Sequence, residues 1–565
     1  MSVKHVGLWL IGAFFVLPVA LGVIGTWLPA FGFLPGVGGR ELGLDAFNAV
    51  LSYPGLSTSL YVTLVSVLLS TVLAFLFSQW LCLALYKRRL WRRMSVSLAP
   101  LMAVPHLAFA VGFSFLISPS GWLLRIVSPW LTGFELPPDW LILKDSNALS
   151  LALVLFLKEI PFFLLMSLSA LTHFDAQKTL HIAQSLGYSR AQAWWKLVFV
   201  QMYPQLKLPF FAVLSYSLSV VDLSLVLGPS APPTFAVLID RWFNDADISY
   251  RLQGAAASVV LLALSLLLFV IYVTFERTLI YCSRHWLVAG PRVKAGITER
   301  LRPLQARLAV MLLWLCFIGA VSALILLSLS KRWRFPNLLP DAVSAKHWLR
   351  LQQALIEAAV NTLSIGLCAT LIAGVFAIAV LEWQSRSENT TTGRASTLMV
   401  FLIYTPLLLP QVSFLFGVQV LYTYVYLDST FAGVIWLHFI FVFPYVYLTL
   451  AKAYFAYDQH YLLQARSLGR SYLSCLVRVK LAMLTKPISF ALATGFAVSS
   501  AQYLATIYAG GGRFETLTTL TVVLHSGSNL PLSAVAALWQ MALPLIVYLM
   551  AIGLPALFFR RRQGM

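Results

Sequence analysis

Five polar side chains lie within otherwise apolar stretches, and they are the residues of this sequence best placed to do chemistry: His106, Lys158, Glu159, Asp222 and Gln411. An ionisable group is costly in an apolar layer, so such groups often bind an ion, relay a proton or line a polar path. A structural interpretation is also open. Lys158 and Glu159 precede Pro161 and could form an internal charge pair, and His106 and Gln411 could hydrogen-bond between helices.

The stretches that hold these residues are expected to be membrane-spanning helices. Hydrophobic residues make up 60% of the 565 residues and charged residues only 11%, and the mean hydropathy is +0.83. Apolar runs of this length must be helical in lipid, because no water is available there for unpaired backbone groups. We predict an all-α, polytopic membrane protein with about twelve spans, at 6–28, 57–86, 95–118, 148–171, 205–228, 253–281, 306–330, 355–382, 396–426, 430–452, 487–508 and 532–559.

The basic residues indicate how the chain is oriented. The net charge of +20 comes from short clusters between apolar runs, such as 87–93 and 560–562. Clusters of this kind mark the cytoplasmic side, so we expect both termini there and expect the chain to bind the lipid bilayer rather than nucleic acid. The loop from Lys331 to Glu357 disagrees, because its five basic residues outnumber two acidic ones on the expected outer side.

Several short patterns occur twice. The third predicted span reads PHLAFAVG from Pro105 to Gly112, and the ninth reads PQVSFLFG from Pro410 to Gly417. Pro161-Phe162-Phe163 and Pro444-Tyr445-Val446 form a second such pair. We therefore predict a duplicated six-span unit, with one half at 1–285, a basic cytoplasmic linker at 286–305 and a second half at 306–565.

The longest repeated pattern is polar and lies at 175–204 and 458–487. Each copy opens with an Asp suited to cap a helix and contains Ala-x-Ser-Leu-Gly, at 183–187 and 465–469. Each glycine is expected to end a short helix with positive φ. Ser189 with Gln192 forms a capping-box pattern for a second helix, and Ser471 is expected to repeat that cap without the Gln.

This helix, glycine turn and helix resembles the cytoplasmic coupling loop of permease subunits of bacterial binding-protein-dependent ABC importers. The whole chain resembles the fused, two-copy permeases of the ferric-iron and thiamine type. The family's Gly matches Gly187 and Gly469, and its second Ala matches Ala183 and Ala465. The family's Glu is replaced by His181 and Leu463, so a charged contact at that position is not expected.

The resemblance implies a permease subunit in the bacterial inner membrane that receives a small solute from a periplasmic binding protein. Two cytoplasmic ATPase subunits, expected to be a homodimer, would bind both loops and hold the ATP and Mg. The residues implied in ATPase coupling are Ala183, Ser185, Leu186, Gly187, Ser189, Ala465, Ser467, Leu468, Gly469 and Ser471. Ferric iron, thiamine, polyamines and small oxyanions all remain open as substrates.

The chain itself is not expected to be an enzyme or to bind a cofactor. It contains no GxxxxGK[ST] loop for ATP phosphates, and its five cysteines are scattered without metal-ligand spacing. Aromatic residues make up 14% of the chain, and we interpret most of them as interfacial and lipid-facing rather than as a cation-binding cage.

Two other function classes remain open. An ion-coupled secondary transporter can also use two parallel six-helix repeats, with Lys158, Glu159 and Asp222 coupling the ion. A membrane scaffold that transports nothing is also compatible with paired cytoplasmic loops.

Overall fold

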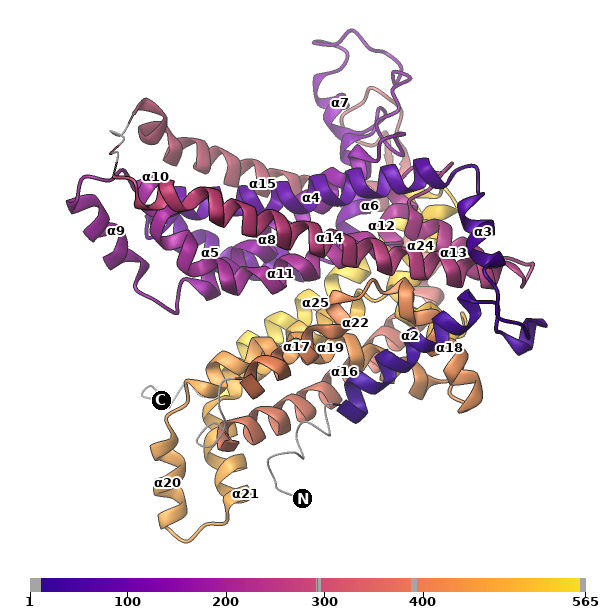
Figure 1. Cartoon of the computed structure of the whole chain (residues 1–565). Helices are drawn as coiled ribbons and strands as arrows, with labels where there is room; N and C mark the ends of the chain where they lie inside the picture. Colours follow the sequence, from indigo (N-terminus) through magenta and orange to yellow (C-terminus); the bar gives the residue numbers. More distant parts are fainter. Residues whose placement is uncertain (1–11, 291, 293–295, 388–393, 559–565) are drawn as a thin grey trace.

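The computed structural model describes residues 12–290, 292, 296–387 and 394–558. Long helices run side by side and form two bundles that meet at one end of the molecule and diverge at the other (Figure 1). The N-terminal part contains η1 (Gly12–Val16), α2 (Leu17–Ala30), η2 (Pro35–Val37), α3 (Asp45–Leu51), α4 (Leu56–Leu85), α5 (Arg89–Ala103), α6 (His106–Ile117), α7 (Trp122–Val127), α8 (Leu149–Ala170), α9 (Ala176–Ser185), α10 (Arg190–Ala193), η3 (Trp194–Val198), α11 (Phe199–Ser219), α12 (Asp222–Leu227), α13 (Phe235–Phe243) and α14 (Tyr250–Val288).

The C-terminal part adds eleven helices of regular α type, one of π type and two very short strands among its described residues. They are α15 (Ile297–Leu329), β1 (Ser330–Arg332), β2 (Ala342–Val343), α16 (Lys346–Ser387), α17 (Arg394–Leu408), α18 (Val412–Tyr424), α19 (Phe431–Phe455), α20 (Gln459–Ser467), α21 (Tyr472–Cys475), η4 (Leu476–Leu481), α22 (Thr485–Ser500), α23 (Leu504–Gly510), α24 (Leu517–Ser526) and α25 (Leu530–Phe558). The strands β1 and β2 pair antiparallel.

The number of membrane spans matches the prediction. Ten helical segments of the described chain are long and apolar enough to cross a bilayer, and the number is twelve if two bent helix pairs each count as one span. One pair, Phe401–Leu408 with Val412–Tyr424, bends by 96°, and the other, Tyr472–Leu481 with Thr485–Ser500, bends by 80°. Each predicted span has a counterpart, and the all-α polytopic membrane class is confirmed.

Two predicted boundaries differ from the structure. The span predicted at 95–118 is broken, because Pro105 lacks the backbone N–H that would continue α5 into α6. A second helix break at a proline lies at Pro410, between α17 and α18. The fifth span is longer than predicted on its N-terminal side, since α10, η3 and α11 follow one another without interruption from Arg190 to Ser219.

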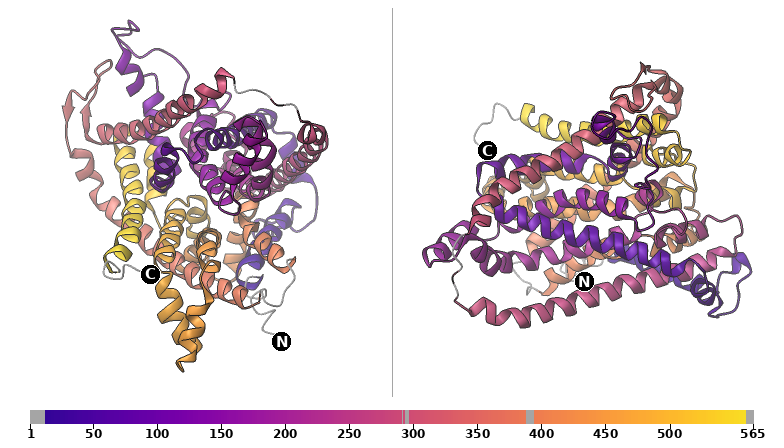
Figure 2. Two further views of the ribbon diagram at one scale, coloured as in Figure 1. Left: turned by 90° about the vertical axis from the view of Figure 1, so that its left-hand side faces the viewer. Right: turned by 90° about the horizontal axis from the view of Figure 1, so that it is seen from above.

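The first helix of each part packs against the other part of the chain. Helix α2 lies against α18 and α14, and α15 lies against α6 and α25 (Figures 1 and 2). Small residues permit these contacts. A Cβ at Gly417 would come within 1.8 Å of the Gly22 carbonyl oxygen, and one at Gly112 within 2.4 Å of the Ala320 carbonyl oxygen. Gly112 and Gly417 are the closing residues of the repeated octapeptide, so this close packing explains why both copies end in glycine.

Helix α7 and the loop after α15 support each other at one side of the molecule. Arg125 is 5% exposed and donates to the Arg334 carbonyl at 2.6 Å and the Asn337 carbonyl at 2.9 Å. Its guanidinium also lies over the Trp333 ring. In the same loop, the Arg334 backbone N–H and the Asn337 amide donate to Asp341 and hold the pKa of that carboxyl below its usual range.

Candidate functional site

The first polar repeat forms the predicted helical hairpin. Asp175 caps α9 by accepting from the Lys178 N–H at 3.0 Å. Gly187 has φ of +88° and ends the helix. Ser189 and Gln192 form a reciprocal capping box at the start of α10. All three local predictions are confirmed, because each rests on hydrogen bonds within a few residues.

The second repeat forms the same hairpin with one difference. Asp458 caps α20 by accepting from the His460 N–H at 3.0 Å, and Gly469 has φ of +79°. Ser471 lies at the start of α21, but its hydroxyl makes no capping hydrogen bond. The expectation that Ser471 repeats the cap is therefore wrong. Ser474 stands where the first copy has Gln192, so no amide reaches back to hold the serine in place.

Both hairpins present their glycine turns to solvent. The side chains of Leu186 and Leu468, next to these glycines, are 55% and 82% exposed. The opposite face of α9 is buried through Ala176, Leu180 and Ala183, as predicted. Of the ten coupling candidates, Ala183 is buried, Ser189 and Ala465 are partly buried, and the exposed ones are Ser185, Leu186, Gly187, Ser467, Leu468, Gly469 and Ser471.

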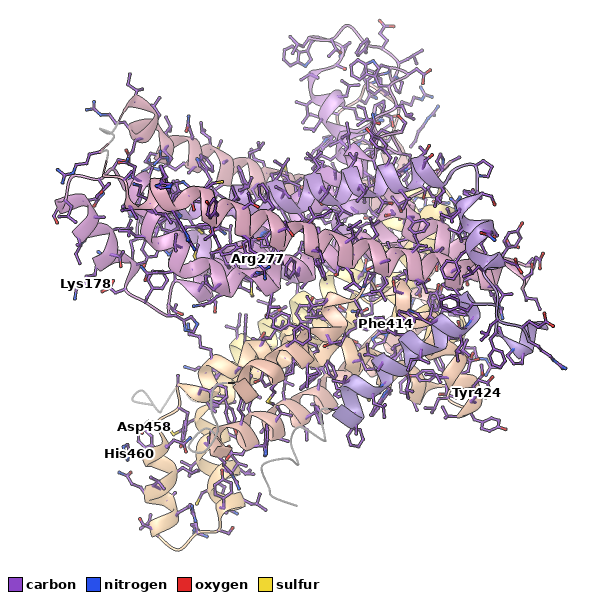
Figure 3. All side chains as sticks on the ribbon, viewed as in Figure 1. Lys178, Arg277, Phe414, Tyr424, Asp458 and His460 are labelled. Atoms are coloured by element: carbon purple, nitrogen blue, oxygen red, sulfur yellow. The ribbon has the colours of Figure 1, made fainter. Side chains whose placement is uncertain are left out.

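The two hairpins lie at the same end of the molecule, one on each bundle. Figure 3 shows Lys178 on the first hairpin and Asp458 and His460 on the second, both at the end where the bundles diverge. The left view of Figure 2 looks onto this end. Two exposed leucines and two glycine turns therefore face the same side of the membrane bundle.

The first hairpin is held by backbone acceptors and by the segment between α14 and α15. Arg190 donates to the Tyr86 carbonyl at 2.8 Å, just beyond the C-terminus of α4. Glu299 accepts from the Ala191 N–H at 3.2 Å, and Lys196 donates to the Ala289 carbonyl at 2.8 Å. A cation is favourable at a helix C-terminus because it meets carbonyls that have no partner in the helix.

The second hairpin is held instead by one buried carboxylate, Glu382 of α16. It accepts from Tyr454 Oη at 2.5 Å, from Lys480 Nζ at 2.9 Å, from Arg386 Nε at 3.1 Å and from the Tyr472 hydroxyl. Lys480 is fully buried, so its charge depends on this carboxylate. We define Glu382, Arg386, Tyr454, Tyr472 and Lys480 as the Glu382 network. Comparing the two polar repeats did not reveal this network, because the first repeat has no counterpart of it.

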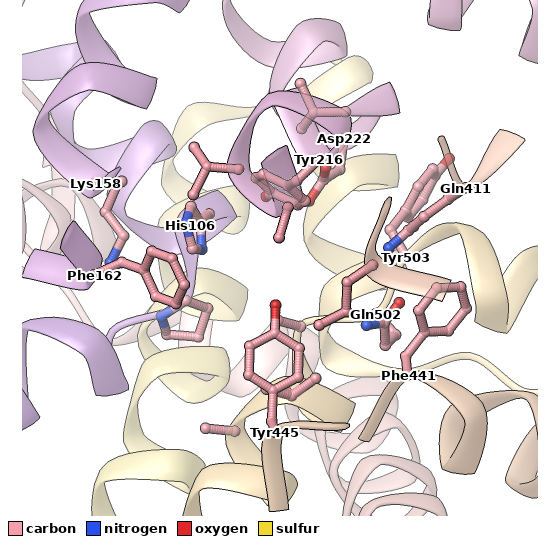
Figure 4. Close-up of a pocket in the computed structure, with 18 of the residues that line it drawn as sticks. His106, Lys158, Phe162, Tyr216, Asp222, Gln411, Phe441, Tyr445, Gln502 and Tyr503 are labelled. Atoms are coloured by element: carbon pink, nitrogen blue, oxygen red, sulfur yellow. The ribbon is translucent and has the colours of Figure 1, made fainter. Parts of the chain in front are cut away.

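All five predicted path residues line one cavity. It has a volume of about 200 Å³ and lies between the two bundles, where α5 and α17 break before α6 and α18 (Figure 4). His106, Lys158, Glu159 and Asp222 come from the N-terminal part and Gln411 from the C-terminal part. The structure therefore brings together residues up to about 300 positions apart in sequence, as expected for helices that enclose a common space.

Lys158 and Glu159 do not pair with each other; within the described residues neither takes part in an ion pair. Lys158 Nζ donates to the carbonyls of Leu101 at 3.1 Å and Val104 at 2.7 Å, the last turn of α5. Pro105 has no N–H for that turn, so the ammonium group caps it. The interpretation as an internal charge pair is wrong, and Lys158 instead stabilises the helix break.

Glu159 and Asp222 are the acids of the cavity. Glu159 is 3% exposed; Oε1 accepts from Ser217 Oγ at 2.6 Å, and Oε2 makes no hydrogen bond in the structure. Asp222 is the first residue of α12. The His106 ring lies beside that of Tyr216, with centroids 5.4 Å apart.

Sequence reasoning missed the aromatic lining of the cavity. Phe162, Tyr216, Phe441, Tyr445 and Tyr503 all contribute to it (Figure 4). A signal was present for two of them, because Phe162 and Tyr445 follow the repeated prolines of α8 and α19 at equivalent positions. The proline repeat therefore marked not only bent helices but also the side chains that line the space between them.

One known protein resembles the chain over nearly its full length. The inner membrane ABC transporter permease protein YnjC of Escherichia coli (strain K12) is 32% identical over 507 residues, which cover 90% of each chain. No family model matches the sequence. The chain belongs to the inner membrane ABC transporter permeases. This membership agrees with the ten to twelve span-like segments of the described residues.

Proposed function

We propose that this permease is the membrane subunit of an ATP-driven importer of the fused, two-copy type. The proposal assigns one permease half to 1–285, a cytoplasmic linker to 286–305 and the second half to 306–565. Support comes from the paired helix breaks at Pro105 and Pro410 and from the paired hairpins. Both termini and both hairpins would face the cytoplasm, and the type would be that of the fused ferric-iron and thiamine permeases.

The observation that carries the proposal is the pair of exposed glycine turns at one end of the molecule. Each turn combines a glycine at positive φ with an exposed leucine, which suits docking into an apolar groove of a separate protein. Because the bundles diverge at this end, force on the two hairpins would move the bundles relative to each other. The partners would be two ATPase subunits, which hold the ATP and Mg, and a periplasmic binding protein.

Charge-introducing variants of the two leucines test this proposal. In Leu186→Asp combined with Leu468→Asp, the ATPase that copurifies with the wild-type chain from its native membranes should be lost. ATP-dependent uptake should fall at least tenfold, because each variant places a carboxylate in an apolar contact. Leu136→Asp is the control, since Leu136 is 77% exposed but lies in the loop between α7 and α8. Retention of the ATPase and of uptake in the double variant would contradict the proposal.

A second candidate function is an ion-coupled secondary transporter, which the cavity-lining acids Glu159 and Asp222 favour. The two functions differ in their energy source. Uptake that continues in vesicles free of ATPase and stops when an ionophore is added would favour ion coupling. Uptake that needs ATP and resists the ionophore would favour the importer.

A further inference from the structure

The charges around the cavity are not balanced within the protein. Lys158 is directed to two backbone carbonyls and also lies over the Phe317 ring, 5.2 Å from its centroid. The positive charge of Lys158 therefore stabilises the C-terminal end of α5. Glu159 and Asp222 have no cationic partner among the ion pairs of the described residues. Buried carboxylates without a counter-charge are unfavourable unless a proton or a cation joins them.

The rest of the cavity wall suits an organic cation. Six Phe and Tyr rings line it, from Phe162, Tyr216, Phe441, Tyr445, Tyr503 and Tyr548. The face of an aromatic ring attracts a cation electrostatically, and the attraction strengthens when water is excluded. Figure 4 shows Phe162, Tyr216, Tyr445 and Tyr503 on different sides of the same space. Carboxylates from the N-terminal part and rings from both parts thus surround the volume in which a solute would lie.

A bare metal ion fits this wall less well. Within the described chain, no group of three or more His, Cys, Asp or Glu side chains lies close enough together to hold a metal ion. The wall supplies two carboxylates, and its other side-chain oxygen donors, such as those of Gln411, Gln502 and the tyrosines, are neutral. The volume of about 200 Å³ is below that of pockets for drug-sized ligands, so the occupant should be small.

We propose that the cavity binds a small organic ammonium ion, with Glu159 and Asp222 supplying the charge and the rings of Tyr216, Tyr445 and Tyr503 enclosing its apolar groups. The proposal rests on the importer function proposed above and names the substrate class of its path. Both halves would contact the same solute, so binding would favour one relative position of the two bundles.

Choline and its neutral carbon isostere, 3,3-dimethylbutan-1-ol, form the central test. They have nearly the same shape and differ in charge. The full-length chain in lipid nanodiscs should bind choline at least tenfold more tightly than the isostere, measured by titration calorimetry. A second probe, 1-methylpyridinium, should compete with choline, and 3,3-dimethylbutanoate should not.

Variants at the acids show whether the preference comes from the cavity. Glu159→Gln with Asp222→Asn should lower choline affinity at least tenfold and leave the weak binding of the isostere unchanged. Tyr445→Leu should lower choline affinity severalfold. The control is Glu357→Gln, which removes an exposed carboxylate of α16 that is absent from the cavity wall. An unchanged elution profile and melting temperature would show that each variant is folded.

The outcomes separate this proposal from the importer function. If neither cation binds more tightly than the neutral isostere, or if the acid variants keep the full preference, the cavity proposal is overturned whatever the ATPase does. If the preference holds and follows the acids, the cavity proposal stands even where the leucine variants retain the ATPase. Choline binding in nanodiscs needs neither ATP nor a binding protein, so it tests the cavity alone.

Discussion

At the scale of single residues, Lys158 shows how a charge in an apolar layer can serve the fold. Its ammonium group satisfies the carbonyl of Leu101, whose helical partner would be the N–H that Pro105 lacks, and that of Val104 at the end of α5. Lys158 is 4% exposed, so no solvent can replace it. The same break places His106 on the cavity wall. Lys158 therefore fixes the backbone at the cavity wall, to which its own side chain also contributes.

Replacement of Lys158 should destabilise the chain without reducing cation binding. In Lys158→Met each freed carbonyl costs about 1 to 3 kcal/mol, so the melting temperature of the solubilised chain should fall by several degrees. Choline affinity should stay equal or rise, because a positive charge near the cavity is removed. Lys346→Met, at the exposed start of α16, is the control. An unchanged melting temperature would show that the end of α5 needs no cap.

At the scale of elements, the two hairpins have the same shape but different attachments. The first is fixed by Arg190 on backbone carbonyls and by Glu299 of α15, and the second by the Glu382 network. A buried ion pair is costly to break, because one charge is then left without its partner. Different substitutions should therefore loosen the two hairpins.

Glu382→Gln should loosen the second hairpin alone. Loss of the carboxylate leaves Lys480 buried without its counter-charge, at a cost of about 3 to 5 kcal/mol. Amide hydrogen exchange should increase at 459–481 and stay unchanged at 176–193. Glu299→Gln should do the opposite, because Glu299 accepts from Ala191 in the first hairpin. Equal loosening of both hairpins by either variant would show that the attachments are not independent.

The difference between local and distant interactions explains what the sequence could predict. Helix caps and glycine turns depend on neighbours within a few residues. The repeated pattern was therefore sufficient to predict the caps at Asp175 and Asp458 and the turns at Gly187 and Gly469. Apart from Arg386, the partners of Lys158 and Glu382 lie outside their own helices, up to 98 positions away. Only the assembled bundle shows that Lys158 caps α5 instead of pairing with Glu159.

At the scale of the whole molecule, the two parts of the chain share their cores. Residues of α15 and α25 join the core around α8, and residues of α2 join the core around α19. The contact of α2 with α18 has a fixed register, since Thr26 Oγ1 accepts from the Gly417 N–H at 3.0 Å. The connection through 286–305 is therefore not what holds the two parts together.

A chain divided after Gly290 should still assemble. Residues 1–290 and 291–565, produced together with different tags, should copurify, because the exchanged helices α2 and α15 each bind the opposite part. Gly417→Val should greatly reduce copurification, since a Cβ there would lie 1.8 Å from the Gly22 carbonyl oxygen. Gly553→Val is the control, because no atom lies within 4 Å of a Cβ at that position. Failure of the unmodified pieces to copurify would show that the linker is required for assembly.

The packing of α2 against α18 also imposes a delay during synthesis of the chain. Thr26 and its partner Gly417 lie 391 positions apart, so α2 enters the bilayer long before α18 has been synthesised. At about 5 to 20 residues per second, the delay is on the order of 20 to 80 s. During that time the small-residue face of α2, with Gly22 and Gly25, lies against lipid or the insertion machinery. Newly made chains should therefore pass through a stage in which α2 is inserted but has not yet packed against α18. Quality-control proteases that recognise unassembled membrane helices would act at that stage.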